Sequence, residues 1–343
     1  MKEFVVTAPN TIAFRDYQEK PLKSQEVRVR SIVSGIKHGT EMALYRGKTP
    51  FLTMPFDRES RLFVNGKRGY SLYPTNLGSW LVGEVVEVGS RVRRFKVGDL
   101  VHGGMPHRPT NVILEEKLYP LKAGMKPETA LFTDPTIFAL QAVHDAQIKV
   151  GDRVVVFGMG ALGLLAVQIA RLNGAELVAG VDIIGRRLEL AKQFGADVVI
   201  NPNERDPALE IKNLTGKKGA DAAIEISGAY PALQQAIRSV QAGGLVVSAS
   251  YYTGSQPLQL GAEWHHNRLT LVSSMPVWGM PHRSYPLWDL KRIQETALRL
   301  LETGRLMTDP MISKRFRYED AAEAYRFIDQ HPEDTIKTLL DYA

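Results

Sequence analysis

The 343-residue sequence predicts an α/β protein that contains a doubly wound parallel sheet. Valine-rich apolar runs alternate with amphipathic helical stretches over residues 154–273, the pattern of a sheet buried on both faces. The preceding part shows short segments of alternating apolar and polar residues broken by turns, which indicates a smaller β-rich domain. Hydrophobic residues make up 44% of the chain and charged residues 23%, so an ordinary globular core is expected.

The stretch Val154–Asp182 carries the clearest motif. A valine-rich strand ends at Gly-Met-Gly-Ala-Leu-Gly, an apolar helix follows at once, and a second strand leads to an aspartate. Gly158 permits a tight turn, Gly160 lets the backbone approach a pyrophosphate, and Gly163 lets the helix pack close to the strand. The helix N-terminus offers free N–H groups and a partial positive charge to phosphates. Because these parts occur in this order, the motif predicts a dinucleotide-binding turn.

Asp182 predicts the type of dinucleotide. It lies at the usual distance after the glycines to accept hydrogen bonds from a ribose 2′-hydroxyl, and its carboxylate would repel a 2′-phosphate. We therefore expect NAD in preference to NADP, a preference that the neighbouring arginines weaken. Further cofactor contacts are expected at the helix start and near later strand ends, at Ala161, Leu162, Arg187, Ser227 and Ser273.

The remaining elements follow from periodicity and turn residues. Before the motif, β-like pieces at 26–30, 77–89, 97–101 and 111–121 lead to a helical pattern over 127–146. After it, helices are predicted over 187–194, 207–214, 231–240 and 290–301, and strands over 198–200, 222–226, 245–249 and 269–273. A final strand–helix–strand pattern over 312–316, 318–328 and 335–340 is expected to return to the first domain.

A short predicted loop near the end of the first β-rich stretch concentrates reactive side chains, namely Lys37, His38, Thr40 and Glu41. A lysine that is desolvated can act as a base near neutral pH, and histidine already titrates there. Structural roles are open as well: Lys37 could pair with Glu41 or Asp134, and His38 could be a buried imidazole with its hydrogen bonds satisfied.

Composition excludes several classes of protein. The sequence has no cysteine, which rules out disulfides and any thiolate zinc site. The net charge of +6 comes from scattered basic residues, so no nucleic-acid partner is expected. No signal sequence or membrane-spanning run is present, and we expect a cytoplasmic protein without a membrane partner.

Several short motifs occur at positions typical of one enzyme superfamily. They are Gly-Thr-Glu at 39–41, a glycine- and valine-spaced pattern over 78–89, Val-Gly-Asp at 97–99, Gly-Asp-Arg-Val at 151–154 and Glu-x-Ser-Gly at 225–228. With them the chain resembles the medium-chain dehydrogenase/reductases, the alcohol dehydrogenase superfamily. The resemblance implies a GroES-like catalytic domain from residues 1–135 and 276–343 and a Rossmann NAD-binding domain from 136–275. It also implies a homo-oligomer, a dimer or tetramer, that pairs through the last strand of the nucleotide domain.

The sequence departs from this superfamily at the catalytic zinc. Members that bind zinc carry cysteine, histidine and cysteine or glutamate at three positions, where this chain has His38, Ser79 and Asp134. The loop with four structural-zinc cysteines is absent. Imidazole nitrogen and carboxylate oxygen both bind zinc, so His38 and Asp134 would be the ligands of any metal. Two such ligands and a serine make a poor site, and we expect no catalytic zinc.

Within the superfamily, the chain resembles the D-guloside 3-dehydrogenase-like sugar dehydrogenases of bacteria. The shared features lie at 37–41, 77–78, 134–135, 263–267 and 329–333. This resemblance implies oxidation of a sugar or glycoside at its C3 hydroxyl to a 3-keto-glycoside, with NAD as the acceptor.

Without zinc, side chains must accept the hydroxyl proton and polarise the substrate oxygen. Lys37 and His38 are the two expected bases. The resemblance places Thr40 where the family has a hydroxyl that relays this proton, and the usual downstream histidine is replaced by Ala43. Asp134 could orient His38, accept a sugar hydroxyl or cap the helix that follows it.

Substrate contacts are expected from an aromatic residue and several polar ones. Trp80 could stack on a sugar ring or fill the space that zinc leaves. The others are Glu41, Glu263, His265 and Asn267, of which the last three could equally form an exposed polar turn. His102 and His107 are expected at the surface.

Three other functions are consistent with parts of this pattern. A zinc-independent quinone or enoyl reductase would usually prefer NADP and an apolar acceptor, which Asp182 and the polar loop disfavour. A relative of the bacteriochlorophyllide dehydrogenases would also lack zinc ligands. A non-catalytic NAD-binding pseudo-dehydrogenase would leave the reactive loop without a role.

Overall fold

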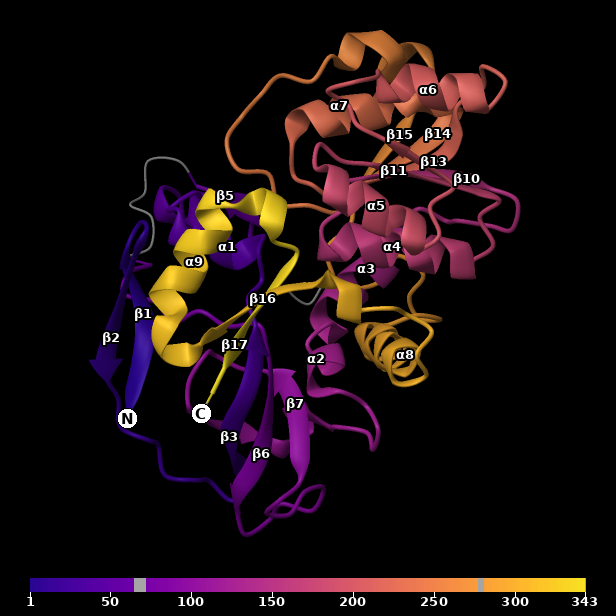
Figure 1. Ribbon diagram of the computed structural model, residues 1–343. Helices are drawn as coiled ribbons and strands as arrows, with labels where there is room; N and C mark the ends of the chain where they lie inside the picture. Colours follow the sequence, from indigo (N-terminus) through magenta and orange to yellow (C-terminus); the bar gives the residue numbers. More distant parts are fainter. Residues whose placement is uncertain (65–71, 277–280, 343) are drawn as a thin grey trace. The chain divides into compact units, whose positions relative to one another are not determined.

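The structure is a computed structural model that describes residues 1–64, 72–276 and 281–342 (Figure 1). The chain divides into two compact units. The first consists of Met1–Asp134 and Ile312–Ala343, and the second of Pro135–Met311. Both chain ends therefore contribute to one unit, as the resemblance implied.

A mixed β-sheet forms the body of the first unit. Within the described residues its strands follow the order β16, β17, β3, β6, β7, β9, and β8 also pairs with β3. Their bounds are Ile312–Arg317, Lys337–Asp341, Glu26–Gly35, Trp80–Val88, Leu100–Gly104, Leu118–Pro120 and, for β8, Thr110–Leu114. Strands β16 and β17 are parallel, and β17 joins the sheet antiparallel to β3. The C-terminal segment thus lies in the sheet beside the strand that leads to the reactive loop.

Smaller elements surround this sheet. The hairpin of β1 (Lys2–Ala8) and β2 (Thr11–Asp16) shares a core with α1 (Thr40–Tyr45) and α9 (Ala321–Gln330). That core buries Phe4, Met42 and Tyr325 almost completely. The other elements are β4 (Phe56–Asp57), β5 (Leu62–Phe63), α2 (Pro127–Ala130) and short helical turns at Pro50–Leu52, Glu115–Lys117, Tyr318–Asp320 and Pro332–Asp334.

The second unit confirms the predicted doubly wound sheet. Six parallel strands in its described part follow the order β12, β11, β10, β13, β14, β15. They are Val198–Ile200, Leu177–Val181, Arg153–Phe157, Ala220–Glu225, Val240–Ser248 and Thr270–Ser273. The helices are α3 (Thr133–Asp145), which begins at the boundary with the first unit, α4 (Ala161–Leu172), α5 (Gly185–Gln193), α6 (Pro207–Leu214), α7 (Tyr230–Ser239) and α8 (Leu290–Glu302). In Figure 1, α4 and α5 lie on one side of the sheet and α6 and α7 on the other.

The described residues between β15 and β16 belong to the second unit, whereas the expected domain boundary assigned residues 276–311 to the first. The amide of Gln168 on α4 exchanges hydrogen bonds of 3.1 and 2.7 Å with the backbone of Met307. The Trp288 ring lies 4.4 Å from the His144 ring on α3. These contacts explain why the compact unit extends to Met311, a difference that no strand pattern signals in the sequence.

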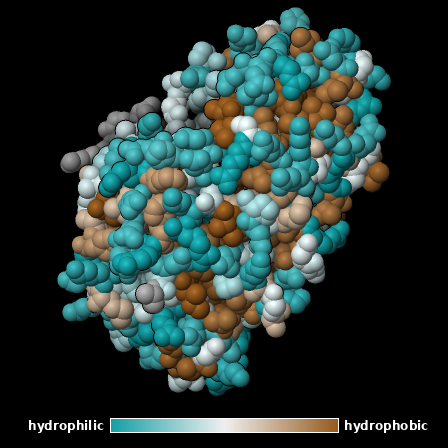
Figure 2. Space-filling view, viewed as in Figure 1, coloured by the Kyte–Doolittle hydropathy of each residue, from teal (hydrophilic) through white to brown (hydrophobic). Residues whose placement is uncertain are grey.

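Several predicted elements have different bounds, among them a helix before the glycine turn and a strand after it. The helical pattern over 127–146 is interrupted, since α2 ends at Ala130 and α3 begins at Thr133. Helix α7 ends at Ser239, and β14 starts at Val240, five residues before its predicted start at Leu245. Within the described residues, no helix is long and apolar enough to span a membrane. Hydrophilic residues cover most of the face shown in Figure 2, with smaller hydrophobic patches between them.

Candidate active site

A cavity of about 280 Å³ lies in the first unit, beside the segment that follows β3. The loop before β6 and the start of α3 complete its wall. The lining residues are Lys37, Thr40, Glu41, Leu44, Asn76, Leu77, Gly78, Ser79, Trp80, Gly104 and Asp134. The structure therefore brings together most of the residues of this unit that the sequence predicted for catalysis or substrate binding.

Lys37 and Asp134 form an ion pair in the cavity wall. The Lys37 Nζ atom lies 2.9 Å from Asp134 Oδ2 and 3.2 Å from Oδ1. Ser79 Oγ donates to Asp134 Oδ2 at 3.3 Å. The two charged side chains are only 22% and 18% exposed, so the pair is largely shielded from bulk solvent. One of the structural partners considered for Lys37 is thus present, on the cavity surface.

Asp134 lies inside the first turn of α3, one residue after its start. An N-cap residue would precede the helix and accept from its first free N–H groups, whereas this carboxylate contacts the side chains of Lys37 and Ser79. The capping role that the sequence allowed for Asp134 is therefore wrong. The role of Ser79 had no local signal, because its partner lies 55 residues away.

Thr40 is the first residue of α1 and lines the cavity with an exposed side chain. Ala43, one turn later, is buried and carries no group that could continue a proton relay. Thr40 can therefore offer its hydroxyl to a bound molecule in the cavity, and α1 provides no second relay group at that position.

His38 has a different environment from its neighbour Lys37. Its Nε2 atom accepts a hydrogen bond of 3.3 Å from the backbone N–H of Thr338, the second residue of β17. His38 is not among the residues that line the cavity. The structure thus separates the two expected bases and leaves the ammonium group of Lys37 on the cavity surface.

Glu41 is buried and hydrogen-bonded within the protein. Its Oε1 atom accepts from the backbone N–H of Lys37 at 2.9 Å, and Oε2 contacts His107 Nε2 at 3.1 Å and accepts from the Tyr325 hydroxyl. Burial alone would raise the pKa of Glu41, but the His107 charge and these hydrogen bonds outweigh it and lower the pKa. Glu41 was predicted to bind substrate. It lines the cavity, and its hydrogen bond to the Lys37 N–H also fixes the turn that carries Lys37.

The buried network continues beyond His107, away from the cavity wall. His107 Nδ1 and Ser34 Oγ lie 2.7 Å apart, and Ser34 Oγ lies 3.0 Å from the Tyr342 hydroxyl. Burial raises the pKa of Tyr342 well above its ordinary value, so this hydroxyl stays protonated. His107 is only 1% exposed, so the expectation of a surface histidine is wrong. Its burial follows from the carboxylate of Glu41, which no nearby sequence pattern reveals.

Trp80 forms part of the cavity wall and is anchored from behind. Its indole N–H donates to His102 Nδ1 at 2.9 Å, and its ring is stacked at 6.2 Å on Tyr119. His102 is fully buried, which also corrects a predicted surface position. Burial lowers the pKa of His102 to about 4, so its ring is neutral and can accept the indole hydrogen bond.

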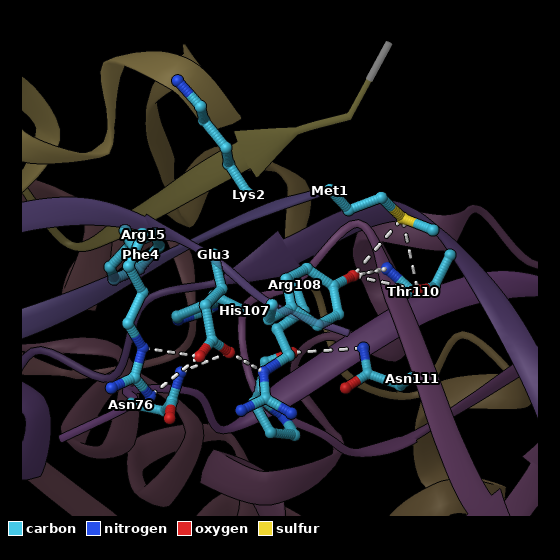
Figure 3. Close-up of polar contacts among 12 residues, drawn as sticks. Met1, Lys2, Glu3, Phe4, Arg15, Asn76, His107, Arg108, Thr110 and Asn111 are labelled. Atoms are coloured by element: carbon cyan, nitrogen blue, oxygen red, sulfur yellow. Dashed lines mark hydrogen bonds and ion pairs between the residues drawn. The ribbon is translucent and has the colours of Figure 1, made fainter. Parts of the chain in front are cut away.

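Asn76 enters the cavity wall from a second buried carboxylate cluster. Figure 3 shows the Glu3 carboxylate between Arg15, Asn76 and Arg108. Arg15 lies 2.8 Å from Glu3 Oε1, and Asn76 Nδ2 donates to Oε2 at 2.9 Å. Since Glu3 is on β1, the hairpin at the chain start holds one side of the cavity in place.

The residues at the family's zinc position differ from a usual zinc ligand set and have other partners in this structure. Asp134 is paired with an ammonium group, Ser79 offers a hydroxyl, and His38 Nε2 accepts from the β17 backbone. Zinc sites in proteins use thiolate, imidazole and carboxylate ligands. Among the described residues, the one group of three side chains close enough to share a metal is His331, Glu333 and Asp334, which is exposed and does not line this cavity. We derive no step through zinc.

The glycine turn of the second unit fits a dinucleotide. Gly158 has φ = +95°, which favours glycine, and a Cβ on it would lie 2.7 Å from the Ser227 side chain. A Cβ on Gly163 would overlap the carbonyl oxygen of Gly158, so α4 can approach the turn only without a side chain there. Gly160 precedes α4, and nothing lies within 4 Å of the position of its Cβ. Open space thus faces the helix start at Ala161 and Leu162.

Asp182 directly follows β11 and is buried. Its Oδ2 atom accepts from the backbone N–H of Met159, inside the glycine turn, at 2.6 Å, and Oδ1 accepts from that of Ile184 at 2.9 Å. Arg187 Nη1 lies 3.8 Å from Oδ2. The carboxylate therefore joins the turn to the next strand, with one arginine close to it.

The predicted serines lie near the same edge of the sheet as the glycine turn. Ser227 follows β13 and donates through Oγ to Glu225 Oε1 at 2.5 Å, and Ser273 ends β15. Burial raises the pKa of Glu225, which also accepts from the Tyr252 hydroxyl. The carboxyl edge of a parallel sheet is where dinucleotides bind in doubly wound folds.

Glu263, His265 and Asn267 lie at the other edge of the sheet. They precede β15, and the Asn267 carbonyl oxygen accepts from the N–H of Gly243 near the start of β14. Glu263 lies 3.4 Å from Arg238 on α7, and His265 is exposed. Because the glycine turn is at the carboxyl edge, this segment is separated from the cofactor edge and matches the polar turn considered as its other interpretation.

Comparison with known proteins adds to this geometry. The model of the zinc-binding dehydrogenase family matches residues 161–290. D-guloside 3-dehydrogenase of Escherichia coli strain K12 is 38% identical over 98% of this chain and 99% of its own length. The chain belongs to the medium-chain zinc-binding dehydrogenase family. It is an NAD(P)-dependent oxidoreductase that acts on CH–OH donors. Positions 38, 79 and 134, which the resemblance compares with the zinc ligands of the superfamily, lie outside the matched segment.

Two solved structures show the same fold. An oxidoreductase of unknown specificity from Escherichia coli superposes with a TM-score of 0.81 and 22% identity, covering 100% of this chain and 99% of that one. A short chain alcohol dehydrogenase from Escherichia coli CFT073, solved with NADH, has a TM-score of 0.78 and 20% identity, with 99% of each chain covered. The predicted family and fold are therefore confirmed, and binding of NAD(P) is typical of this family.

Proposed function

We propose that this dehydrogenase oxidises a secondary hydroxyl of a sugar or glycoside, at C3, to a 3-keto-glycoside, with NAD as the acceptor and without zinc. The observation that carries the proposal is the ion pair of Lys37 and Asp134 in the cavity wall, near the position that the family resemblance assigns to a metal. The 38% identity with D-guloside 3-dehydrogenase over nearly the whole chain supports the sugar substrate.

The residues of the cavity supply the proton chemistry. In the proposed reaction Lys37 first releases its ammonium proton to solvent. The hydroxyl proton of the substrate then passes to the resulting amine, and the hydride on the same carbon passes to NAD, which leaves a ketone. Asp134, 2.9 Å from Nζ, stabilises the ammonium ion that forms. Thr40 and Ser79 can hydrogen-bond the substrate oxygen from the same wall. The reverse reaction uses the ammonium proton.

The geometry favours Lys37 over His38 as the base. A base must come within hydrogen-bond reach of the proton that it accepts. Lys37 lines the cavity, whereas the Nε2 atom of His38 accepts from the Thr338 amide. We therefore assign proton transfer to Lys37 and a structural role to His38.

The lining of the cavity disfavours an apolar acceptor. Charged or polar side chains of Lys37, Asn76, Ser79 and Asp134 enter the wall beside Leu44, Leu77 and Trp80. A sugar offers several hydroxyl groups to such a wall, whereas an enone or quinone would leave its polar groups unpaired. This lining supports a polyhydroxyl substrate over the reductase functions considered from the sequence.

NAD would be held by the second unit. The open space beside Gly160 and the first N–H groups of α4 suit a pyrophosphate, and Asp182 suits a ribose without a 2′-phosphate. We propose NAD over NADP because a phosphate would meet the buried carboxylate of Asp182, against a single neighbouring arginine, Arg187.

NADH formation with methyl glycosides of the gluco, galacto, gulo and allo series tests this function directly. Each substrate is assayed with NAD and with NADP, before and after EDTA treatment. We expect turnover with NAD that survives EDTA. Loss of activity in EDTA with recovery on zinc addition would contradict the metal-free site. NAD binding without turnover of any glycoside or polyol would favour the non-catalytic alternative.

We also propose that two copies pair along β15. This strand ends the sheet in the described part of the unit, and Leu271 on it is 40% exposed. An unpaired strand edge with apolar side chains favours addition of another strand. Light scattering after size exclusion should give a dimer for the native chain and a monomer for Leu271→Lys. A monomeric native chain would contradict this pairing.

A further inference from the structure

Lys337, the first residue of β17, is buried behind the cavity wall. It is 3% exposed, and lysine is almost never fully buried without partners. Its Nζ atom donates to the carbonyl oxygen of Ile36 at 3.3 Å and lies 6.0 Å from the centroid of the Phe132 ring. Ile36 precedes Lys37 by one residue and Phe132 precedes Asp134 by two. One buried side chain thus contacts both segments that carry the ion pair.

The start of β17 holds the segment Ile36–His38 at three points. Besides the Lys337 bond to the Ile36 carbonyl, the N–H of Ile36 donates to the Thr338 carbonyl at 3.0 Å. The N–H of Thr338 donates to His38 Nε2 at 3.3 Å. These bonds flank Lys37 on both sides, so the position of the proposed base depends on β17.

Lys337 also changes the charge balance of the wall. Lys37 faces Asp134 and His107 faces Glu41, and His107 carries a charge only when its ring is protonated. When the His107 ring is neutral, the two carboxylates and the one ammonium group leave one negative charge in excess. Negative charge develops on the substrate oxygen as its proton leaves, and an excess of carboxylates would oppose it. Burial lowers the pKa of Lys337 to about 8, an effect that Lys37 reinforces and that Asp134 and Glu41 oppose. Below that pH, Lys337 is charged and balances the second carboxylate.

We infer that Lys337 is a positioning residue of this site, which anchors the segment that carries Lys37 and supplies the positive charge that balances Asp134 and Glu41. This inference rests on the proposed function. It adds a residue near the end of the chain, more than 200 positions from Asp134 along the sequence, to a site built by the first unit. Lys337 does not line the cavity, so it acts through Lys37 and not on substrate.

The experiment compares Lys337→Met, Lys337→Arg and the native enzyme in glycoside oxidation across pH. In Lys337→Met we expect kcat to fall by roughly 10²-fold, the cost of a small misplacement at a reacting group, with the Kd of NAD unchanged. Native kcat/KM should decline as pH rises through about 8, where Lys337 loses its charge. This decline should be absent in Lys337→Met and moved to higher pH in Lys337→Arg. Native turnover with an unchanged pH profile in Lys337→Met would overturn the inference.

Lys314→Met is the matched control, since Lys314 is an exposed lysine on the neighbouring strand β16. Native behaviour is expected from it. If Lys337→Met does not fold, Gly35→Ala replaces it, because a Cβ there would lie 2.5 Å from Cε and 2.8 Å from Nζ of Lys337 and would displace that flexible end. A native pH profile in Gly35→Ala would then overturn the inference.

A separate measurement keeps the inference apart from the proposed function. If the native chain oxidises no glycoside, the proposed function fails, and hydrogen exchange still tests the anchoring role. Backbone amides over residues 34–42 should exchange faster in Lys337→Met, or in Gly35→Ala if that protein does not fold, than in the native chain and in Lys314→Met. Equal exchange rates would overturn the anchoring role whatever the substrate is.

Discussion

The two units each hold a shielded aspartate, and these two residues are satisfied in different ways. Asp182 accepts hydrogen bonds from backbone N–H groups of Met159 and Ile184, at most 23 positions away. Asp134 is paired with the side chains of Lys37 and Ser79, which lie 97 and 55 positions away. The contacts of Asp182 are local, and they do not depend on which side chains Met159 and Ile184 carry, because the donors are backbone N–H groups. The arrangement around Asp134 is assembled from three distant segments.

This difference separates the proposed cofactor site from the proposed catalytic site. The glycine turn and Asp182 can form within one α/β unit, whatever happens in the other sheet. The cavity wall depends on β3, the loop before β6, the start of α3 and the C-terminal strand. Substitutions in the two regions should therefore affect different measurements.

The largest expected effect is that of Lys37→Met. Loss of the proposed base should lower kcat by about 10²- to 10⁴-fold. The Kd of NAD, measured by quenching of protein fluorescence, should stay within a factor of two because the glycine turn is unchanged. Lys48→Met, an exposed lysine of the same unit, is the matched control. Native turnover in Lys37→Met would show that the ion pair is structural.

The second largest effect should be the pH dependence of the unfolding free energy that arises from His102. Burial lowers the pKa of His102 to about 4 in the folded protein. As pH falls below about 6.5, His102 therefore becomes protonated in the unfolded chain while it stays neutral in the folded protein. Stability from this residue is present above pH 6.5 and is lost as pH falls towards 4, by up to about 3 kcal/mol. Urea unfolding at pH 7.5 and pH 5 should show a steeper loss in the native chain than in His102→Phe. If the native chain and His102→Phe lost the same unfolding free energy between pH 7.5 and pH 5, the burial of a neutral imidazole would be contradicted.

Substitutions of two glycines in one turn should affect different quantities, the stability of the protein in one case and the affinity for NAD in the other. Gly163→Ala places a methyl group against the Gly158 carbonyl, and we expect a loss of about 1–3 kcal/mol in unfolding free energy. Gly160→Ala points into open space and should leave the melting temperature unchanged while the Kd of NAD rises by about 10-fold, or about 1.4 kcal/mol. Calorimetry and titration of both variants check this contrast. A stable Gly163→Ala protein would contradict the close approach of α4.

The smallest expected effect is that of Ser79→Ala. Asp134 keeps its ion pair with Lys37 at 2.9 Å and loses one hydroxyl donor, so kcat/KM should fall by less than about 10-fold. Steady-state kinetics with NAD held at saturation measures it. A loss as large as that of Lys37→Met would mean that the hydroxyl itself handles the proton.

The parts of the molecule that were predictable are those whose signals are local. The strand, glycine turn, helix and Asp182 occur within about 30 residues, and their arrangement in the second unit matches the predicted motif. The loop with Lys37 was also recognisable, because several reactive residues are adjacent. Which of its residues is the base could not be predicted, since the choice between Lys37 and His38 depends on the hydrogen bond from a β17 amide to His38.

The errors share one physical cause. His102 and His107 were expected at the surface because they lie where the loop with the structural-zinc cysteines is missing. Trp80 and Glu41, from other elements, supply their partners inside the protein. The polar segment around Glu263 read equally well as a substrate contact or a turn, and only the direction of β15 places it at the amino edge of the sheet. Single-sequence patterns specify neighbours along the chain, whereas these groups are defined by neighbours in space.

The position of β17 in the sheet also affects how the protein is made. This strand lies between β16 and β3, so the sheet of the first unit is incomplete until residues 337–341 have left the ribosome. The second unit lies wholly between the two halves of the first and can fold earlier in synthesis, since domains generally fold as units. The second unit can therefore be complete while the sheet beside the cavity still lacks its C-terminal strand.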